Sequence, residues 1–145
     1  MAAAPTPPYE PNQDERTMGT LAHLLQLVTS WMGPLVILFV KRDSLFVKFH
    51  ALQALILQIC LAAFWIVAVV IFMVTMFTTV PRSGATAHNA LPPAVFIVFP
   101  IFWVAGMSVW VVVLAVAIVY GIKAGRGEWA GYPVIARLAR HLLKM

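Results

Sequence analysis

Polar side chains lie inside the long apolar stretches of this 145-residue chain, and five of them draw attention by their type and spacing. His23, Gln26 and Ser30 follow one another at three- and four-residue steps and share one helix face, and His50 and Gln53 share another. A polar group in hydrocarbon costs free energy unless it is hydrogen-bonded, so each is a candidate functional residue. We favour contacts between helices, which contribute about 1 kcal/mol or less each. The alternative is a hydrated path along the stripe of Gln26 and Ser30.

Imidazole side chains can also ligate haem or a metal ion, but the predicted positions of the two histidines argue against a shared centre. If every apolar segment crosses the membrane, His23 lies near the outer end of the first segment and His50 near the inner end of the second. Their depths then differ by roughly 25 Å, at about 1.5 Å per residue. We therefore expect no metal and no cofactor.

A catalytic constellation is not evident either. Asp43 and Glu128 are the only acids after residue 15, and both occupy expected helix boundaries, where capping or pairing with cations explains them. Ser30 and Cys60 have no base partner in the sequence pattern that would activate a hydroxyl or a thiol. We expect no catalytic residue and no enzymatic activity.

The elements that carry these residues are strongly apolar. Hydrophobic residues make up 62% of the chain, and no charged residue occurs between Lys48 and Arg82 or between Arg82 and Lys123. A soluble domain of this size cannot bury so much apolar surface, which predicts an all-α integral membrane protein. About 20 apolar residues cross a bilayer, so we expect three transmembrane helices, over about 17–40, 46–77 and 93–122. They belong to a membrane domain, 14–126, that follows a disordered, proline-rich tail, 1–13.

The basic residues predict how these spans are oriented. Eight of the ten follow the first or the third span: Lys41, Arg42, Lys48, Lys123, Arg126, Arg137, Arg140 and Lys144. Only Arg16 and Arg82 are expected on the opposite side. Because cytoplasmic loops carry an excess of Lys and Arg, we predict an outer N-terminus and a cytoplasmic C-terminus. The expected location is a bacterial cytoplasmic (inner) membrane, since the N-terminal residues do not resemble a transit peptide.

Residues 127–145 have a pattern of their own. From Pro133 onward, apolar and basic side chains lie on opposite faces of a helix, which predicts a basic amphipathic helix on the cytoplasmic surface. Arg137, Arg140 and Lys144 are the expected contacts with anionic lipid headgroups, at about 1 kcal/mol per charge. Aromatic residues do not interleave with these cations, so nucleic acid is not an expected partner.

Small residues recur near the end of the third predicted span. Ala117, Gly121 and Gly125 are spaced four residues apart and so lie on one helix face. A face without large side chains lets another helix backbone approach closely. The spacing would allow a second helix to pack there.

Several short motifs resemble one family of small bacterial membrane proteins. In chain order they are Leu21-Ala22-His23-Leu24, Gly33-Pro34, Lys41-Arg42-Asp43, Phe49-His50-Ala51, Gly127-Glu128 and Tyr132-Pro133. The family is the domain of unknown function four-eight-seven-zero, which is similar to the Tic-twenty-type component of chloroplast protein import. The resemblance implies a helical membrane domain from Thr17 to Leu138 and a connection with protein translocation.

Two functions from different classes fit these expectations. In the first, a non-enzymatic membrane protein acts by association with other membrane proteins, with lipids or with copies of itself. In the second, an oligomer forms a conduit for a solute or a polypeptide, because three spans cannot enclose a pore alone. We favour the first function, since it requires only packed spans and a basic surface helix.

Overall fold

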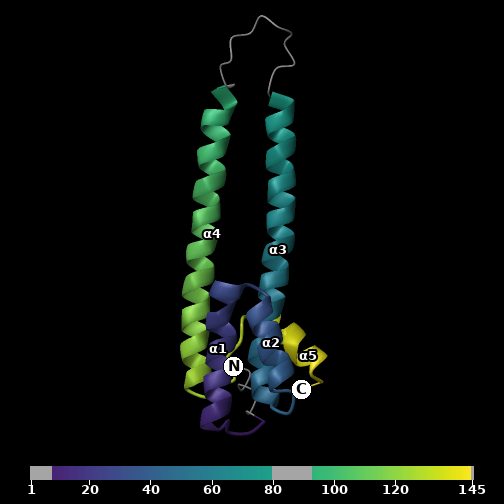
Figure 1. The fold of residues 1–145 in the computed structure, drawn as a ribbon, viewed down its shortest axis with the longest axis vertical. Coiled ribbons are helices and arrows are strands. Elements are labelled where there is room, and N and C mark those ends of the chain that lie inside the picture. Colours follow the sequence, from purple (N-terminus) through teal and green to yellow (C-terminus); the bar gives the residue numbers. More distant parts are fainter. Residues whose placement is uncertain (1–7, 80–92, 145) are drawn as a thin grey trace, which may run out of the picture. The chain divides into compact units, whose positions relative to one another are not determined.

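The computed structural model describes residues 8–79 and 93–144, and all regular structure in these ranges is helical. Figure 1 shows the five helices: α1 (Gln13–Thr29), α2 (Met32–Val40), α3 (Leu45–Thr79), α4 (Pro93–Gly125) and α5 (Ile135–Leu142). The chain divides into two compact units. The first unit contains residues 1–60 and 114–145, and the second contains residues 61–113. The prediction of an all-α membrane protein agrees with this architecture, but the number of spans does not.

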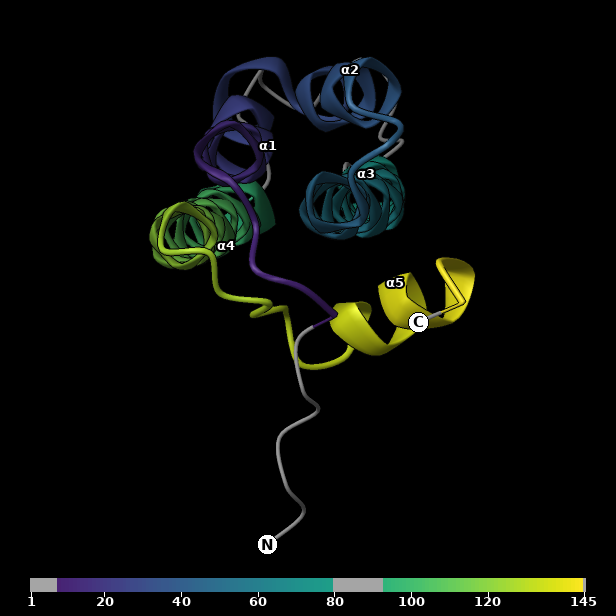
Figure 2. The same cartoon turned by 90° about the horizontal axis from the view of Figure 1, so that it is seen from below.

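The first apolar segment is a helical hairpin. A capping box starts α1, in which Asn12 Oδ1 accepts from the Glu15 amide and Glu15 Oε2 accepts from the Asn12 amide, each at 2.9 Å. Ser30 ends α1 with a φ of 55°, and the chain then turns back as α2. Lys41 Nζ lies 2.5 Å from Asp14 Oδ2, so the end of α2 meets the first turn of α1. Figures 1 and 2 show α1 and α2 side by side.

The prediction of a transmembrane helix over 17–40 is therefore wrong. Neither α1, with 17 residues, nor α2, with 9, is a candidate span. Hydropathy measures the length of an apolar run but does not detect a reversal within it. Gly33 permits this reversal, because a Cβ there would lie 3.2 Å from the Leu25 carbonyl carbon and would overlap the Leu25 side chain.

The other two predicted spans are confirmed as long apolar helices. Residues Leu45–Thr78 of α3 and Val95–Gly125 of α4 are long and apolar enough to cross a membrane. Ser44 caps α3, since the Val47 amide donates to its hydroxyl oxygen at 3.1 Å. Most large apolar side chains between 61 and 79 and between 95 and 113 are exposed, as expected for helices that face lipid.

The small-residue face of α4 receives α1. The Thr20 hydroxyl oxygen lies 3.1 Å from the Gly121 carbonyl oxygen and shares its single proton between this carbonyl and that of Arg16. A Cβ at Gly121 would lie 3.7 Å from His23 Cβ, and a Cβ at Gly125 would lie 3.1 Å from the Thr20 hydroxyl oxygen. This close approach brings the His23 side of α1 to the centre of the first unit.

The prediction that the two ends of the chain lie on opposite sides of the membrane is also wrong, because the start of α1 lies beside the segment after α4. The Trp129 indole donates to the Tyr9 carbonyl at 3.0 Å, and the two rings meet edge to face at 5.5 Å. Arg16 also packs closely against Gly127, since a Cβ at Gly127 would lie 2.9 Å from Arg16 Nε. Two candidate spans return the chain to the side where it began. Residues from Tyr9 onward make specific contacts, so the structured part begins earlier than the predicted boundary at residue 13.

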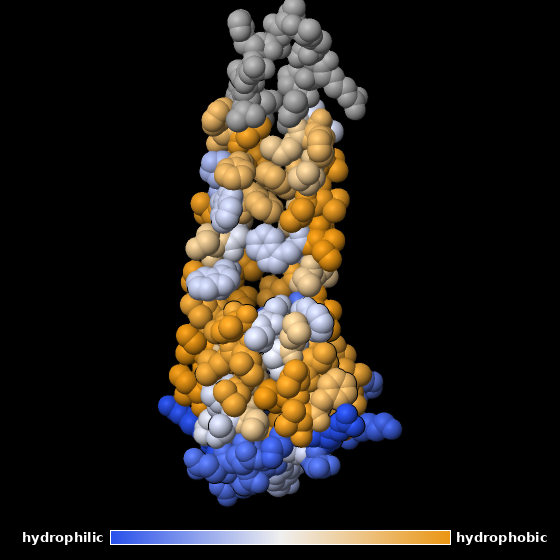
Figure 3. Space-filling model, in the orientation of Figure 1, coloured by the Kyte–Doolittle hydropathy of each residue, from blue (hydrophilic) through white to orange (hydrophobic). Residues whose placement is uncertain are grey.

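We call this end of the first unit the basic end. It carries Lys41, Arg42, Lys48, Lys123 and Arg126 together with Arg16, and Arg82 lies outside the described residues. Figure 3 shows hydrophilic residues gathered at this end of the first unit. Both described ends of the chain therefore lie at the basic end.

Candidate functional site

A buried polar network lies at the centre of the first unit. Helix α1 contributes His23 and Gln26, α3 contributes His50 and Gln53, and the segment after α4 contributes Tyr132. His23, His50 and Gln53 are fully buried, and Gln26 is 2% exposed. Buried polar groups are stable only when they are hydrogen-bonded, so their partners determine what this network does.

The two histidines contact each other directly. His23 Nε2 lies 3.0 Å from His50 Nδ1, and the rings meet edge to face with centroids 5.2 Å apart. The other nitrogen of His23, Nδ1, lies 2.8 Å from the Tyr132 hydroxyl. The other nitrogen of His50, Nε2, lies 3.2 Å from the Glu128 carbonyl oxygen. One chain of hydrogen bonds thus joins α1, α3 and the segment that follows α4.

The Glu128 carbonyl fixes the direction of this chain, because a carbonyl can only accept. His50 Nε2 must carry a proton, so in a neutral ring its Nδ1 accepts from His23 Nε2. His23 Nδ1 then accepts from the Tyr132 hydroxyl, whose oxygen accepts from the Gln26 amide at 3.3 Å. All four bonds are satisfied when both histidines are neutral and carry their proton on Nε2.

Two glutamines extend the network. The Tyr132 amide donates to Gln53 Oε1 at 2.9 Å, and Gln53 Nε2 donates to the Phe49 carbonyl at 3.1 Å. Gln26 Oε1 is buried and has no hydrogen-bond partner among the described residues. The segment around Tyr132 is therefore held by both its hydroxyl and its backbone.

Aromatic rings enclose the histidines. Phe46 and Phe49 pack on His50 with centroid distances of 4.5 and 5.3 Å, and both rings contact Trp129. Tyr120 packs on Tyr132 at 4.6 Å. Such rings exclude water and so raise the free-energy cost of a missing hydrogen bond.

Burial shifts the pKa values of the network in the direction that this hydrogen-bond pattern requires. Desolvation lowers the pKa of His23 from 6.5 to about 4, so the imidazole is neutral at pH 7. Desolvation also raises the pKa of Tyr132 to about 12, which keeps the hydroxyl proton that is donated to His23. Both groups are neutral in the same pH range.

The structure overturns the predicted separation of the two histidines. The roughly 25 Å difference in depth assumed that α1 and α2 form one span. Because the segment turns back at Ser30, His23 returns to the depth of His50. Four of the five candidate residues meet in the network. Ser30 lies at its edge, where its hydroxyl donates to Gln58 Oε1 at 3.3 Å.

Sequence analysis missed two members of the network. Tyr132 belongs to the Tyr132-Pro133 motif, but its distance in sequence from the spans gave no sign that it returns to α1. The Glu128 contribution is a backbone carbonyl, which no residue type reveals. The glycine at position 131 was the one sequence feature that could have indicated close packing of this segment. In the structure, a Cβ at Gly131 would overlap Gln53 and Ala136.

The arrangement supports a structural role, in which hydrogen bonds hold α1, α3 and the segment after α4 together, rather than acid–base chemistry. The described residues contain no group of three or more His, Cys, Asp or Glu side chains that could hold a metal ion. The facing histidine nitrogens are bonded to each other at 3.0 Å, which leaves no room for an ion between them. The chain ends at an amide and at a backbone carbonyl, and neither releases a proton.

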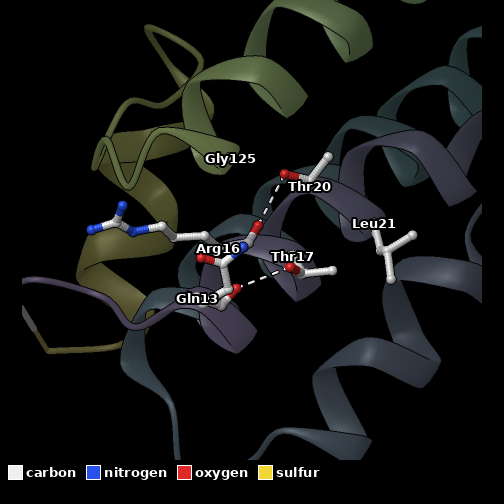
Figure 4. Close-up of a pocket in the computed structure, with 6 residues that line it drawn as sticks. All are labelled: Gln13, Arg16, Thr17, Thr20, Leu21 and Gly125. Carbon is white, nitrogen blue, oxygen red and sulfur yellow. Dashed lines mark hydrogen bonds between the residues drawn. The ribbon is translucent and has the colours of Figure 1, made fainter.

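A pocket of about 230 Å³ lies between the start of α1 and the end of α4 (Figure 4). Its lining residues are Gln13, Arg16, Thr17, Thr20, Leu21 and Gly125. The Thr17 and Thr20 hydroxyls donate to backbone carbonyls one turn earlier, each at 2.9 Å (Figure 4). The Arg16 guanidinium donates to the Pro11 carbonyl and pairs with Glu10 at 3.0 Å. Because these polar side chains are already bonded within the chain, the pocket is a weaker candidate for a functional site than the network.

Comparison with known protein families gives the network a context. The model of the magnetosome magnetite crystal formation protein family, MamF/MmsF, matches residues 14–139. The chain belongs to this family. The match covers the hairpin, both candidate spans, the network and most of α5. As a MamF/MmsF protein, it is a helical membrane protein of the magnetosome involved in magnetite crystal formation.

This membership corrects the family resemblance drawn from the short motifs. Assignment to the domain of unknown function four-eight-seven-zero, with its link to Tic-twenty-type protein import, is wrong. His23, His50 and Tyr132, which belong to three of these motifs, contact one another or share the buried network, and such packing does not identify a function. No curated protein and no solved structure matched the MamF/MmsF chain.

Proposed function

We propose that this MamF/MmsF protein supports magnetite crystal formation as a non-enzymatic component that associates with lipids and other proteins of the magnetosome membrane. One observation carries the proposal: the polar side chains inside the apolar helices are bonded to one another. His23, Gln26, His50 and Gln53 are buried at the centre of the first unit, so they do not line a hydrated path. Such a network holds a fold together and leaves the outer helix faces for association.

The second unit supplies a surface for a protein partner. On α4, Trp103, Met107 and Val111 are 53–57% exposed and lie along one shallow hollow. Large aromatic and sulfur-containing side chains around a hollow are typical of contacts between proteins. We propose that this face of α4 meets another protein of the magnetosome membrane.

A complementation experiment tests the association. In a strain lacking this protein, Trp103→Ala with Val111→Ala should change crystal size or number while the protein accumulates to its normal level, because neither side chain is buried. Val70→Ala with Val74→Ala, which changes exposed residues of α3, is the matched control and should behave as wild type. Normal crystals with both double variants would contradict a role for this α4 face. Solute flux in liposomes that depends on Gln26 would favour the conduit instead.

We also propose that α5 lies on anionic lipid. Ala136 and Ala139 pack against Phe49, while Val134, Leu138 and Leu142 point outward and are 47–80% exposed. Arg137 and Lys144 are exposed beside them. Arg140 has a different contact, since its guanidinium lies 5.6 Å from the centroid of the Phe49 ring. Two of the three predicted headgroup contacts are thus available to lipid.

Thiol accessibility tests the placement of α5. In a Cys60→Ser background, Leu138→Cys should react more slowly with a water-soluble maleimide in liposomes that contain phosphatidylglycerol than in purely zwitterionic liposomes. Arg137→Gln with Lys144→Gln should abolish this difference. Equal reaction rates in both kinds of liposome would contradict the proposed lipid contact.

A further inference from the structure

The outer face of the α1–α2 hairpin is apolar and uncovered in the monomer. Six of its side chains are 48–85% exposed: Val28, Trp31, Met32, Val36, Phe39 and Val40. No charged residue occurs from Thr17 to Val40. An exposed apolar surface of this kind requires an occupant, either lipid or protein.

Charge is confined to the base of the hairpin. Asp14 and Lys41 form an ion pair where α1 begins and α2 ends, and the Arg42 guanidinium lies 5.1 Å from the centroid of the Phe39 ring. The tip, at Ser30, lies at the end of the hairpin opposite these charges. This distribution suits a segment whose base lies among headgroups and whose tip lies in hydrocarbon.

Polar groups at the tip of the hairpin are hydrogen-bonded by Gln58, a side chain of the candidate span α3. The last carbonyl groups of a helix have no partner within it and normally bond to water. At the end of α1, Gln58 Nε2 from α3 donates to the Gln26 carbonyl at 3.1 Å, while Gln58 Oε1 accepts from the Ser30 hydroxyl. Irregular backbone survives at membrane depth only where protein groups replace water in this way.

The same contact gives the depth of the tip. Gln58 follows the start of α3 by 13 residues, which is about 20 Å along the helix at about 1.5 Å per residue. Helix α2, with nine residues, is about 14 Å long. The hydrocarbon core is about 30 Å thick, so the hairpin ends near its middle.

We infer that the α1–α2 hairpin is embedded in one leaflet of the membrane, the leaflet at the basic end, and that acyl chains of that leaflet cover its outer face. This inference goes beyond the proposed function and does not depend on it. Each copy of the protein then inserts extra helices into one leaflet only, whereas α3 and α4 cross both.

Spin labels on the full-length protein test this placement. The protein is reconstituted in liposomes of phosphatidylcholine and phosphatidylglycerol, in a Cys60→Ser background. Met32→Cys places a nitroxide at the tip, and Asp43→Cys places the control label at the base. Power saturation then compares collision with oxygen, which concentrates in hydrocarbon, and with a nickel chelate, which remains in water.

We expect the Met32 label to collide with oxygen and to be shielded from nickel, and the Asp43 label to show the opposite preference. Access of the nickel chelate to the tip label would overturn the inference, because the tip of the hairpin would then lie in water rather than in hydrocarbon. Shielding of the tip from both agents would also overturn it, since a second protein copy would then be the occupant. Val28→Cys, at a position that is 85% exposed, provides a second tip label if Met32→Cys disturbs folding.

Discussion

At the scale of single residues, the Glu128 carbonyl determines the direction of the whole hydrogen-bond chain. Since it can only accept, it fixes the tautomer of His50, then that of His23, and finally the direction of the Tyr132 hydroxyl. The network therefore has one arrangement with both histidines neutral, and each member can be tested separately.

His50→Ala should destabilise the protein strongly. It leaves the buried His23 Nε2 without a partner, at about 1–3 kcal/mol, and it also removes the part-buried contact with the Glu128 carbonyl. Thermal unfolding in detergent measures the loss. The matched control is Glu128→Gln, which changes an exposed side chain and keeps the carbonyl, so its Tm should equal that of wild type. Equal Tm values for all three proteins would contradict the network.

Tyr132→Phe removes only the hydroxyl at the other end of the chain. His23 Nδ1 and the Gln26 amide then lose their partner, which should lower the free energy of unfolding by about 1–3 kcal/mol. Tyr120→Phe serves as the control, because Tyr120 contributes ring packing to the site. If the two variants were equally stable, the hydroxyl would have no structural role.

Acid should weaken the first unit through His23. Burial lowers its pKa to about 4 in the folded protein, whereas the unfolded chain binds the same proton near 6.5. The unfolded state therefore holds more protons between these values, so the free energy of unfolding falls as pH drops from about 6.5 to about 4. Comparison of unfolding at pH 7.5 and 4.5 tests this. His23→Gln should flatten the pH profile, and an unchanged profile would disprove the assignment.

At the scale of elements, hydropathy predicted α3 and α4 well and failed at the first segment. Long uninterrupted apolar runs have few alternatives to a span, so the predicted bounds of 46–77 and 93–122 lie close to Leu45–Thr79 and Pro93–Gly125. The first run contains a reversal that depends on the φ of Ser30 and on the missing side chain of Gly33. Neither property contributes to hydropathy.

Substitutions at Ser30 should separate the turn from its hydroxyl. Glycine adopts a positive φ without strain, so Ser30→Gly should keep the hairpin and lose one exposed hydrogen bond. Ser30→Val places a β-branched residue at the same φ and should destabilise the protein by about 1–3 kcal/mol relative to Ser30→Gly. Chemical denaturation in detergent measures both. Greater stability of Ser30→Val would show that the segment is a continuous helix.

At the scale of the whole molecule, the number of membrane crossings follows from that one turn. Composition was sufficient to predict an all-α membrane protein, and the basic residues were sufficient to identify one charged side. The candidate polar residues were also found from the sequence, because polar groups stand out in apolar segments. Their meeting was not predictable, since it requires the reversal of α1 into α2 and the return of Tyr132 to α1.

Chemical cross-linking of position 14 to position 41 tests the reversal most directly. In a Cys60→Ser background, Asp14→Cys with Lys41→Cys should be joined by a short bis-maleimide in native membranes, because the native side chains meet across the base of the hairpin and the reagent spans the length that the lysine side chain filled. Asp14→Cys with Ser30→Cys, at opposite ends of α1, should not cross-link. If residues 14–41 formed one spanning helix, its ends would lie about 40 Å apart. The hairpin predicts efficient cross-linking within one chain, and its absence with both cysteines reactive would contradict the account.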